Sequence, residues 1–192
     1  GNLITTIVDD ETTETYEWNA KGELTAVEVT ENGETGRIEF AYDHDGVRVA
    51  MTVDGEEIRF LVDKNQQQFA QVIEEYTPDG DVITAYTYGW DLISQDNGTE
   101  GVYYQVDGLG STRNLTDENG LATNEYVYDV YGNLLNQVDV SENNYLFTGE
   151  QLDEATGLTY LRARYYDAET GRFISRDPFE GFNDLDMLDK MV

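Results

Sequence analysis

Residues 126–134 read Tyr-Val-Tyr-Asp-Val-Tyr-Gly-Asn-Leu, the clearest copy of the unit from which the architecture of the chain can be predicted. Tyr126 and Tyr128 are two positions apart, so on a β-strand both rings point to the same face. Asp129 can accept hydrogen bonds from the backbone N–H groups of a turn, and Gly132 can adopt the positive φ that a tight turn requires. The pattern therefore predicts a strand, a turn and a second strand that together form an antiparallel hairpin.

The same unit recurs along the chain. Complete copies begin at Tyr16 and Phe40, looser copies begin at Tyr76 and Leu115, and Tyr86-Thr87-Tyr88 carries the aromatic pair without the usual turn. Such repetition indicates that the aromatic pairs form packing layers of a repeat architecture. We predict an all-β protein made of antiparallel β-hairpins in one long curled sheet.

Alternation of apolar residues supports this prediction and assigns faces to the strands. Three runs alternate, and we expect each to place its members on one face: Ile38, Phe40 and Tyr42; Val47, Val49, Met51 and Val53; Ile58, Phe60 and Val62. The run from Gln66 to Ile73 fits helix or strand, and its hairpin neighbours favour strand. Leu185, Leu188 and Val192 have helical spacing, which indicates a short amphipathic helix or a disordered end over 182–192.

Composition excludes several classes of function. The chain has 40 acidic and 11 basic residues, which gives a formal charge of 11 − 40 = −29. The negative electrostatic field of such a chain opposes binding to nucleic acids and to anionic membrane surfaces. No apolar run reaches the roughly 18 residues of a membrane span. Cysteine is absent and His44 is the only histidine, which argues against thiol catalysis, a histidine-based triad and a multi-histidine metal centre. We expect no cofactor.

The C-terminal third carries a more specific signal. Residues 145–153 read Tyr-Leu-Phe-Thr-Gly-Glu-Gln-Leu-Asp, residues 156–167 read Thr-Gly-Leu-Thr-Tyr-Leu-Arg-Ala-Arg-Tyr-Tyr-Asp, and residues 170–178 read Thr-Gly-Arg-Phe-Ile-Ser-Arg-Asp-Pro. Together with Asp-Gly-Leu-Gly-Ser-Thr at 107–112, these stretches resemble the Rhs, or YD-repeat, family, which is related to the shell proteins of insecticidal toxin complexes and to teneurins. The resemblance implies YD-type repeats over 1–125, a core-associated segment over 126–181 and a non-repeat tail over 182–192.

The resemblance also implies a function. YD repeats form a β-ribbon that spirals into a hollow shell, here a partial spiral shell, which in toxins encloses a C-terminal effector. The chain is thus expected to be a structural segment of a secreted or cell-surface bacterial protein. Its partner would be its own or a neighbouring effector polypeptide, encoded past Val192, and self-association through open sheet edges is a further possibility. An alternative from another class is an adhesion or glycan-binding repeat module.

A third alternative is the remnant of an aspartyl self-cleaving core. On matching positions, the resemblance assigns the family's functional arginine to Arg164 and its aspartate to Asp177. A guanidinium can hold a carboxylate by a bidentate bond, and both residues can equally be structural. The family continues to a second Asp-Pro-x-Gly motif where cleavage occurs, whereas residues 182–192 read Phe-Asn-Asp-Leu-Asp-Met-Leu-Asp-Lys-Met-Val. We therefore expect no self-cleavage in this chain and no enzymatic activity.

Two further clusters have plain interpretations. Arg162, Arg164, Arg172 and Arg176 lie within fifteen positions, and in so acidic a chain they are expected to pair with internal carboxylates. The stretches 9–11 and 43–45 are acidic and suggest Ca²⁺, but neither has the spacing of a known calcium loop. We predict acidic turns there and no metal site.

Overall fold

Two antiparallel sheets make up the protein in the computed structural model, which describes residues 1–8, 12–65 and 69–177. The strands of the first sheet lie in sequence order, each paired with its neighbours along the chain: β1 (Thr5–Ile7), β2 (Thr12–Trp18), β3 (Leu24–Glu31), β4 (Glu34–Tyr42), β5 (Arg48–Val53), β6 (Glu56–Asp63), β7 (Gln71–Tyr76), β8 (Val82–Tyr88), β9 (Leu92–Asp96), β10 (Gly101–Val106), β11 (Thr112–Thr116), β12 (Ala122–Tyr128) and β13 (Leu134–Val138). A short 3-10 turn, η1 (Phe147–Gly149), leads to the second sheet, which contains β14 (Gln151–Asp153), β15 (Leu158–Leu161), β16 (Arg164–Asp167) and β17 (Arg172–Phe173).

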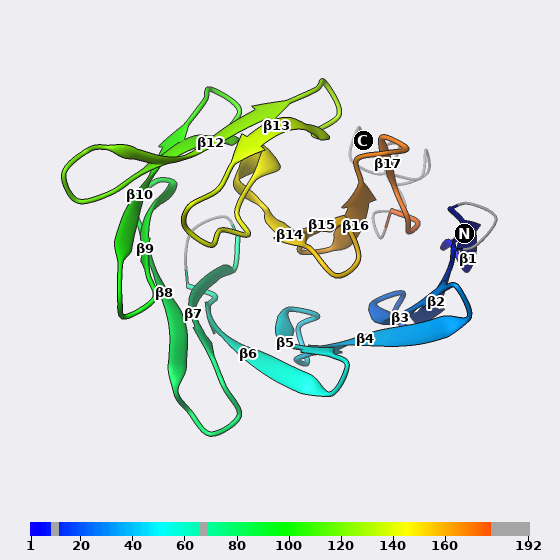
Figure 1. The fold of residues 1–192 in the computed structure, drawn as a ribbon. Helices are drawn as coiled ribbons and strands as arrows, with labels where there is room; N and C mark the ends of the chain where they lie inside the picture. The colour runs from blue at the N-terminus through cyan, green and yellow to red at the C-terminus, as the bar shows by residue number, and fades with distance from the viewer. Residues whose placement is uncertain (9–11, 66–68, 178–192) are drawn as a thin grey trace, which may run out of the picture.

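The large sheet curls into an open ring, and the small sheet lies in its hollow (Figure 1). The predicted curled sheet of antiparallel hairpins is therefore confirmed. We call β14–β17 the plug. No helix in the described ranges is long and apolar enough to cross a membrane.

The hairpin turns follow the repeated unit. The Asp129 Oδ1 accepts hydrogen bonds from the backbone N–H groups of Tyr131, Gly132 and Asn133 at 2.8, 2.9 and 3.0 Å. Gly132 has a φ of +100°, which a residue with a Cβ adopts only under strain. The Asn133 side chain also donates a hydrogen bond to the Asp129 Oδ2, at 2.9 Å. This bond and the backbone N–H bonds lower the pKa of Asp129. The ionised carboxylate therefore stabilises the turn.

Each such turn is followed by a β-bulge. Tyr128 pairs with Leu134 whereas Val127 pairs with Asn136, so one residue of β13 is skipped. The same shift follows the turns at Asn19, Asp43, Thr77, Asp107 and Asp117. Because a bulge bends its strand and increases the local twist, the repeated bulges account for the curl of the ring.

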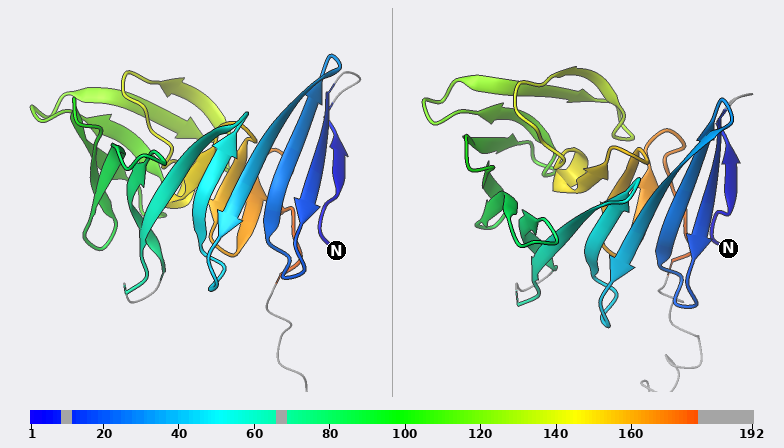
Figure 2. Two further views of the ribbon diagram at one scale, coloured as in Figure 1. Left: turned by 90° about the horizontal axis from the view of Figure 1, so that it is seen from below. Right: turned by 60° about the horizontal axis from the view of Figure 1, so that its bottom comes forward.

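Successive turns alternate between the two edges of the ribbon. The turns after β2, β4, β6, β8, β10 and β12 share one edge, which we call rim A; the turns after β3, β5, β7, β9 and β11 share the opposite edge, rim B. Figure 2 shows the β2–β3 and β4–β5 turns at the lower edge of its left view. Rim B includes the two-residue turns Asn32-Gly33 and Asp54-Gly55, whose positive φ angles are those of type I′ hairpins.

The concave face of the ring forms the core together with the chain inside it. In a first cluster, Tyr16, Leu24, Val27, Ile38 and Phe40 of the ring pack against Leu158, Tyr160, Tyr165 and Ile174. In a second cluster, Tyr86, Tyr104, Tyr126 and Tyr128 pack around Tyr145 and Leu146. The aromatic pairs therefore serve as packing layers, as predicted from their repetition.

One predicted face is wrong in part. Met51 and Val53 pack against the core as expected, but Arg48, and not Val49, takes the interior position ahead of them, with 2% of its surface exposed. The reason is the bulge after the Asp43 turn, because Tyr42 pairs with Arg48 while Ala41 pairs with Ala50. The other two alternating runs are confirmed at Ile38 and Phe40, and at Phe60 with Leu61 exposed on the opposite face.

The remaining predictions are partly outside the described residues. The strand favoured over 66–73 is confirmed for its last part, since β7 begins at Gln71, whereas Phe69 and Ala70 are not in a strand and 66–68 are not described. The predicted helix over 182–192 also lies outside the described residues. The division of the chain after residue 125 stays a prediction; β12 and β13, on its C-terminal side, belong to the ring.

Candidate functional site

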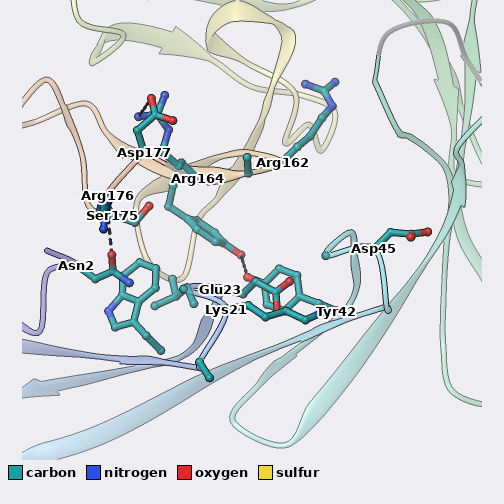
Figure 3. Close-up of a pocket in the computed structure, with 17 residues that line it drawn as sticks. Asn2, Lys21, Glu23, Tyr42, Asp45, Arg162, Arg164, Ser175, Arg176 and Asp177 are labelled. Atoms are coloured by element: carbon teal, nitrogen blue, oxygen red, sulfur yellow. Dashed lines mark hydrogen bonds and ion pairs between the residues drawn. The ribbon is translucent and has the colours of Figure 1, made fainter. Parts of the chain in front are cut away.

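The structure brings together the two residues that the resemblance singled out. Arg164 opens β16, Asp177 lies four positions after the end of β17, and the Arg164 Nη1 is 3.0 Å from the Asp177 Oδ2 (Figure 3). The guanidinium carbon also lies 3.6 Å from the ring centroid of Phe173. A guanidinium held between a ring face and a carboxylate has a fixed orientation. The pair is therefore positioned, although the Asp177 side chain is 52% exposed and solvent screens the attraction.

This pair lines a pocket of about 470 Å³ on rim A, between the ring and the plug. Its walls include Trp18 and Tyr42 from the ring and Tyr165 from the plug, and the Tyr42 and Tyr165 hydroxyl oxygens are 3.0 Å apart. Four cationic residues and three carboxylates line it: Lys21, Arg162, Arg164, Arg176, Glu23, Asp45 and Asp177. The pocket is thus nearly balanced in charge within a strongly acidic protein.

The N-terminal segment closes one side of this pocket. The backbone N–H of Leu3 donates to the Ile174 carbonyl at 2.8 Å, and the backbone N–H of Arg176 donates to the Asn2 Oδ1 at 3.1 Å. Trp18 donates its indole N–H to the Leu3 carbonyl at 2.6 Å. These bonds join the beginning of the chain to the residues that follow β17, and so fix the backbone next to Asp177.

Two members of the arginine cluster pair internally, as expected. Besides Arg164, Arg162 contacts the Glu150 Oε1 at 2.5 Å and donates from Nε to the Ala70 carbonyl at 3.0 Å. Burial raises the pKa of Glu150, and the neighbouring Arg162 opposes that shift. The hydrogen bond to Ala70 ties the plug to the ring at the β6–β7 connection.

A buried ion pair that the sequence analysis missed lies deeper in the hollow. Arg48 of β5 and Asp153 of β14 are 2.5 Å apart (Nη1 to Oδ2), and both side chains are 1% exposed. The Arg48 Nη2 donates to the Gln151 Oε1 at 2.7 Å, and the guanidinium lies 4.2 Å from the centroid of the Tyr160 ring. A buried guanidinium needs these partners because an unpaired charge in a protein interior is strongly unfavourable.

The buried network continues to Glu75 of β7. Its Oε1 accepts hydrogen bonds from the Tyr86 hydroxyl at 2.9 Å and from the Gln151 Nε2 at 3.2 Å. Burial raises the pKa of Glu75, while the Tyr86 hydrogen bond and Arg48 oppose the shift. Polar side chains of the ring thus bind the plug at several points along the hollow.

The β-bulge that follows a rim A turn is the signal that could have revealed Arg48 as an interior residue. After such a bulge, the residue two positions beyond the turn glycine points inward, as Leu24 and Thr112 also do.

The acidic turn at Asp43-His44-Asp45 has a different use. Ligand atoms of the three side chains lie within 4.8 Å of one another. The Lys64 ammonium forms ion pairs with Asp43 and, at 2.8 Å, with Asp45. The single Lys64 ammonium therefore offsets part of the negative charge of these two carboxylates. The second acidic stretch, 9–11, lies outside the described residues.

Comparison with known proteins agrees with this architecture. The profile of the Teneurin YD-shell family matches residues 5–190. The chain belongs to this family. Among curated proteins, the YD-shell chain is 35% identical over 182 residues to the tRNA nuclease WapA of Bacillus subtilis, covering 92% of this chain and 8% of WapA. It is 31% identical over 177 residues to the probable deoxyribonuclease RhsA of Dickeya dadantii, covering 85% of this chain and 12% of RhsA.

Solved structures show the same fold. The TcdB2-TccC3-Cdc42 crystal structure superposes with a TM-score of 0.67 at 20% identity, over 86% of this chain and 9% of that one. The Photorhabdus luminescens Tc holotoxin pore gives a TM-score of 0.65 at 21% identity, over 96% of this chain and 10% of that one. The YD-shell chain therefore spans about a tenth of the proteins that it resembles, and is a segment of an Rhs-type YD-shell fold.

Proposed function

We propose that this chain is a wall and plug segment of a YD-shell that encloses or presents a C-terminal toxin polypeptide. The observation that carries the proposal is the ring itself, whose aromatic concave face surrounds a hollow and holds the plug by buried contacts such as Arg48–Asp153. The family match and the relatives named as nucleases support it. The partner would be an effector carried by the same or a neighbouring polypeptide.

The wall itself is proposed to be non-catalytic. The nuclease relatives are about ten times longer than the matched segment, which leaves room for their catalytic parts elsewhere. A charge of −29 also disfavours nucleic-acid binding by this segment. Since related shells come from bacterial toxins, we place the protein outside the cell or at its surface.

Limited proteolysis of the complete polypeptide that contains this sequence tests the proposal. We expect its C-terminal polypeptide to resist protease while the shell is intact, and to become sensitive after Arg48→Met, which removes a buried contact between wall and plug. Arg59→Met is the matched control, because Arg59 is an exposed arginine on the neighbouring strand. A C-terminal polypeptide that is cut as fast in the intact protein as alone would contradict enclosure, and binding of glycans should then be measured.

A specific contact favours a second role for one part of the segment. Arg164 and Asp177 form an oriented ion pair, and we propose that this pair takes part in self-cleavage of the complete polypeptide, together with groups outside residues 1–177. Intact mass spectrometry of the complete protein and its Asp177→Asn variant tests this role. Two co-purifying fragments from the parent and one chain from the variant would support it. A single chain from both would make Asp177 structural.

A further inference from the structure

Three Asn-Gly dipeptides lie in turns on rim B. Asn32-Gly33 lies between β3 and β4, Asn97-Gly98 between β9 and β10, and Asn119-Gly120 between β11 and β12. The first lies at the upper edge of the left view of Figure 2. An asparagine before glycine readily loses its side-chain amide, because glycine has no Cβ and its backbone nitrogen can approach the asparagine side chain closely. The three dipeptides are therefore candidate positions for this modification.

The reaction begins at the backbone nitrogen of the glycine. This nitrogen loses its proton and bonds to the asparagine Cγ, the Cγ–Nδ2 bond breaks, and ammonia leaves with that proton, so that a succinimide ring closes. Water from the solvent then opens the ring at either carbonyl carbon and gives aspartate or isoaspartate. A hydrogen bond donated by the glycine N–H opposes the first step, because this bond must be released before the nitrogen can attack.

Two of the three glycines donate such a hydrogen bond. The Gly98 N–H donates to the Asp96 Oδ1 at 2.7 Å. The Gly120 N–H donates to the Asp117 carbonyl at 3.0 Å. Both nitrogens are therefore already engaged in the folded protein.

The asparagine side chains of these two turns are engaged as well. The Asn97 Oδ1 accepts hydrogen bonds from the backbone N–H groups of Thr99 and Glu100, both at 3.0 Å, and from the Thr99 hydroxyl at 2.7 Å. The Asn119 Nδ2 donates to the Asp117 Oδ2 at 3.4 Å. Rotation of either carboxamide toward its glycine would break these bonds, so each turn protects its asparagine in two ways.

The Asn32-Gly33 turn has neither form of protection. Within the residues that the structure describes, no hydrogen bond involves the Gly33 N–H or the Asn32 carboxamide. Both residues are exposed, and no heavy atom lies within 4 Å of the position that a Cβ on Gly33 would occupy. The nucleophile, the carboxamide and the attacking water are therefore unobstructed at this tip.

Local charge does not separate the three sites. Carboxylates oppose the loss of the glycine proton, because they disfavour a second negative charge nearby. Acidic residues flank every one of the dipeptides, namely Glu31 and Glu34, Asp96 and Glu100, and Asp117 and Glu118. Hydrogen bonding within the turn is thus the feature that distinguishes Asn32 from the other two asparagines.

A second hairpin shows which product the turn accepts. Asp54-Gly55 forms the same type of two-residue turn, with φ angles of +49° and +91°, compared with +52° and +84° for Asn32-Gly33. Aspartate at position 32 therefore fits the turn. Isoaspartate adds a carbon to the main chain between residues 32 and 33, which is incompatible with a two-residue turn that pairs Glu31 with Glu34.

We propose that Asn32 is a site of spontaneous deamidation in the folded protein, and that the turns around Asn97 and Asn119 protect those residues. The modification adds a negative charge at the β3–β4 tip, and its isoaspartate product disrupts the end of that hairpin. The inference goes beyond the proposed function and holds whether or not the shell encloses a toxin.

Peptide mapping by mass spectrometry, during incubation of the complete polypeptide at mildly alkaline pH, tests the inference. We expect Asn32 to react roughly tenfold faster or more than Asn97 and Asn119, the factor expected when bonds within a turn must first be released. In urea the three rates should converge. Asp96→Ala removes the acceptor of the Gly98 N–H, so it should raise the rate at Asn97 and leave the rate at Asn32 unchanged.

Equal rates in the folded protein, or a faster reaction at Asn97 or Asn119, would overturn the inference. So would an unreactive Asn32 in the folded protein when all three sites react in urea. A difference that persists in urea would assign the rates to the flanking sequence and remove the role of the turns. An Asn32→Asp variant that unfolds at a lower urea concentration than the wild type would contradict the fit of the aspartate product.

Discussion

Removing either member of the Arg48–Asp153 pair should destabilise the protein far more than removing both. Arg48→Met leaves Asp153 buried with a charge and without its cation; its Oδ1 already has no hydrogen-bond partner among the described residues. Breaking a buried ion pair in this way costs about 3–5 kcal/mol. In a protein of this size, that loss lowers the melting temperature by roughly 10 °C or more.

Asp153→Leu should cost less, near the lower end of that range. Arg48 would still donate to Gln151, and its guanidinium would keep its contact with the Tyr160 ring at 4.2 Å. In the double variant Arg48→Met/Asp153→Leu no charge remains in the interior, so its loss should be smaller than that of either single variant. A double-mutant cycle of the wild type, the two single variants and the double variant should then give a coupling energy of about 2 kcal/mol or more between positions 48 and 153.

Urea unfolding, followed by tryptophan fluorescence and near-UV circular dichroism, measures all four proteins of this cycle. Arg59→Met provides the control, since Arg59 is exposed, and its midpoint should equal that of the wild type. Losses that simply add, or a loss below about 1 kcal/mol for Arg48→Met, would refute the reasoning. Either result would mean that water reaches the pair and screens it.

Three other perturbations give distinct signatures. Gly132→Ala should destabilise the protein by about 1–3 kcal/mol more than Gly120→Ala in urea unfolding, because both glycines have a positive φ but only at Gly132 would a Cβ overlap an aromatic ring, that of Phe147; equal losses would contradict this. Glu75→Gln should change the pH dependence of stability: burial raises the pKa of the glutamate, so the contribution of Glu75 to stability is expected to fall as the pH rises through the interval that begins near the unfolded value of 4.5, and equal slopes in the wild type and the variant would show that Glu75 does not titrate there. Arg164→Met and Asp177→Asn should each change stability by only about 0–1 kcal/mol, since the pair is partly exposed, and a larger loss would mark a structural role.

The fold could be predicted because its rules are local. Aromatic pairs such as Tyr126 and Tyr128 and the Asp129–Gly132 turn act within a few residues, so the sequence states them directly. What it does not state is the register after each turn. A bulge there reverses the faces, and for this reason Arg48 could not be recognised as an interior residue beside Val49.

The candidate site was only partly predictable. Resemblance pointed to Arg164 and Asp177, and the structure places them 3.0 Å apart, while their role stays a prediction. Asp153 could not be paired with Arg48 from the sequence, because 105 positions separate them and only the position of the plug joins them.

The position of the plug also has a consequence for the order of folding. Every strand of the ring pairs with its sequence neighbour, so contacts of low sequence separation can form one after another as the chain is synthesised. The plug contacts strands more than a hundred residues earlier, as in Arg48–Asp153 and Tyr42–Tyr165. Until the plug has been synthesised, Arg48 therefore lacks its counter-ion and the aromatic concave face of the ring lacks its cover, so completion of the core is expected to be the last step of folding.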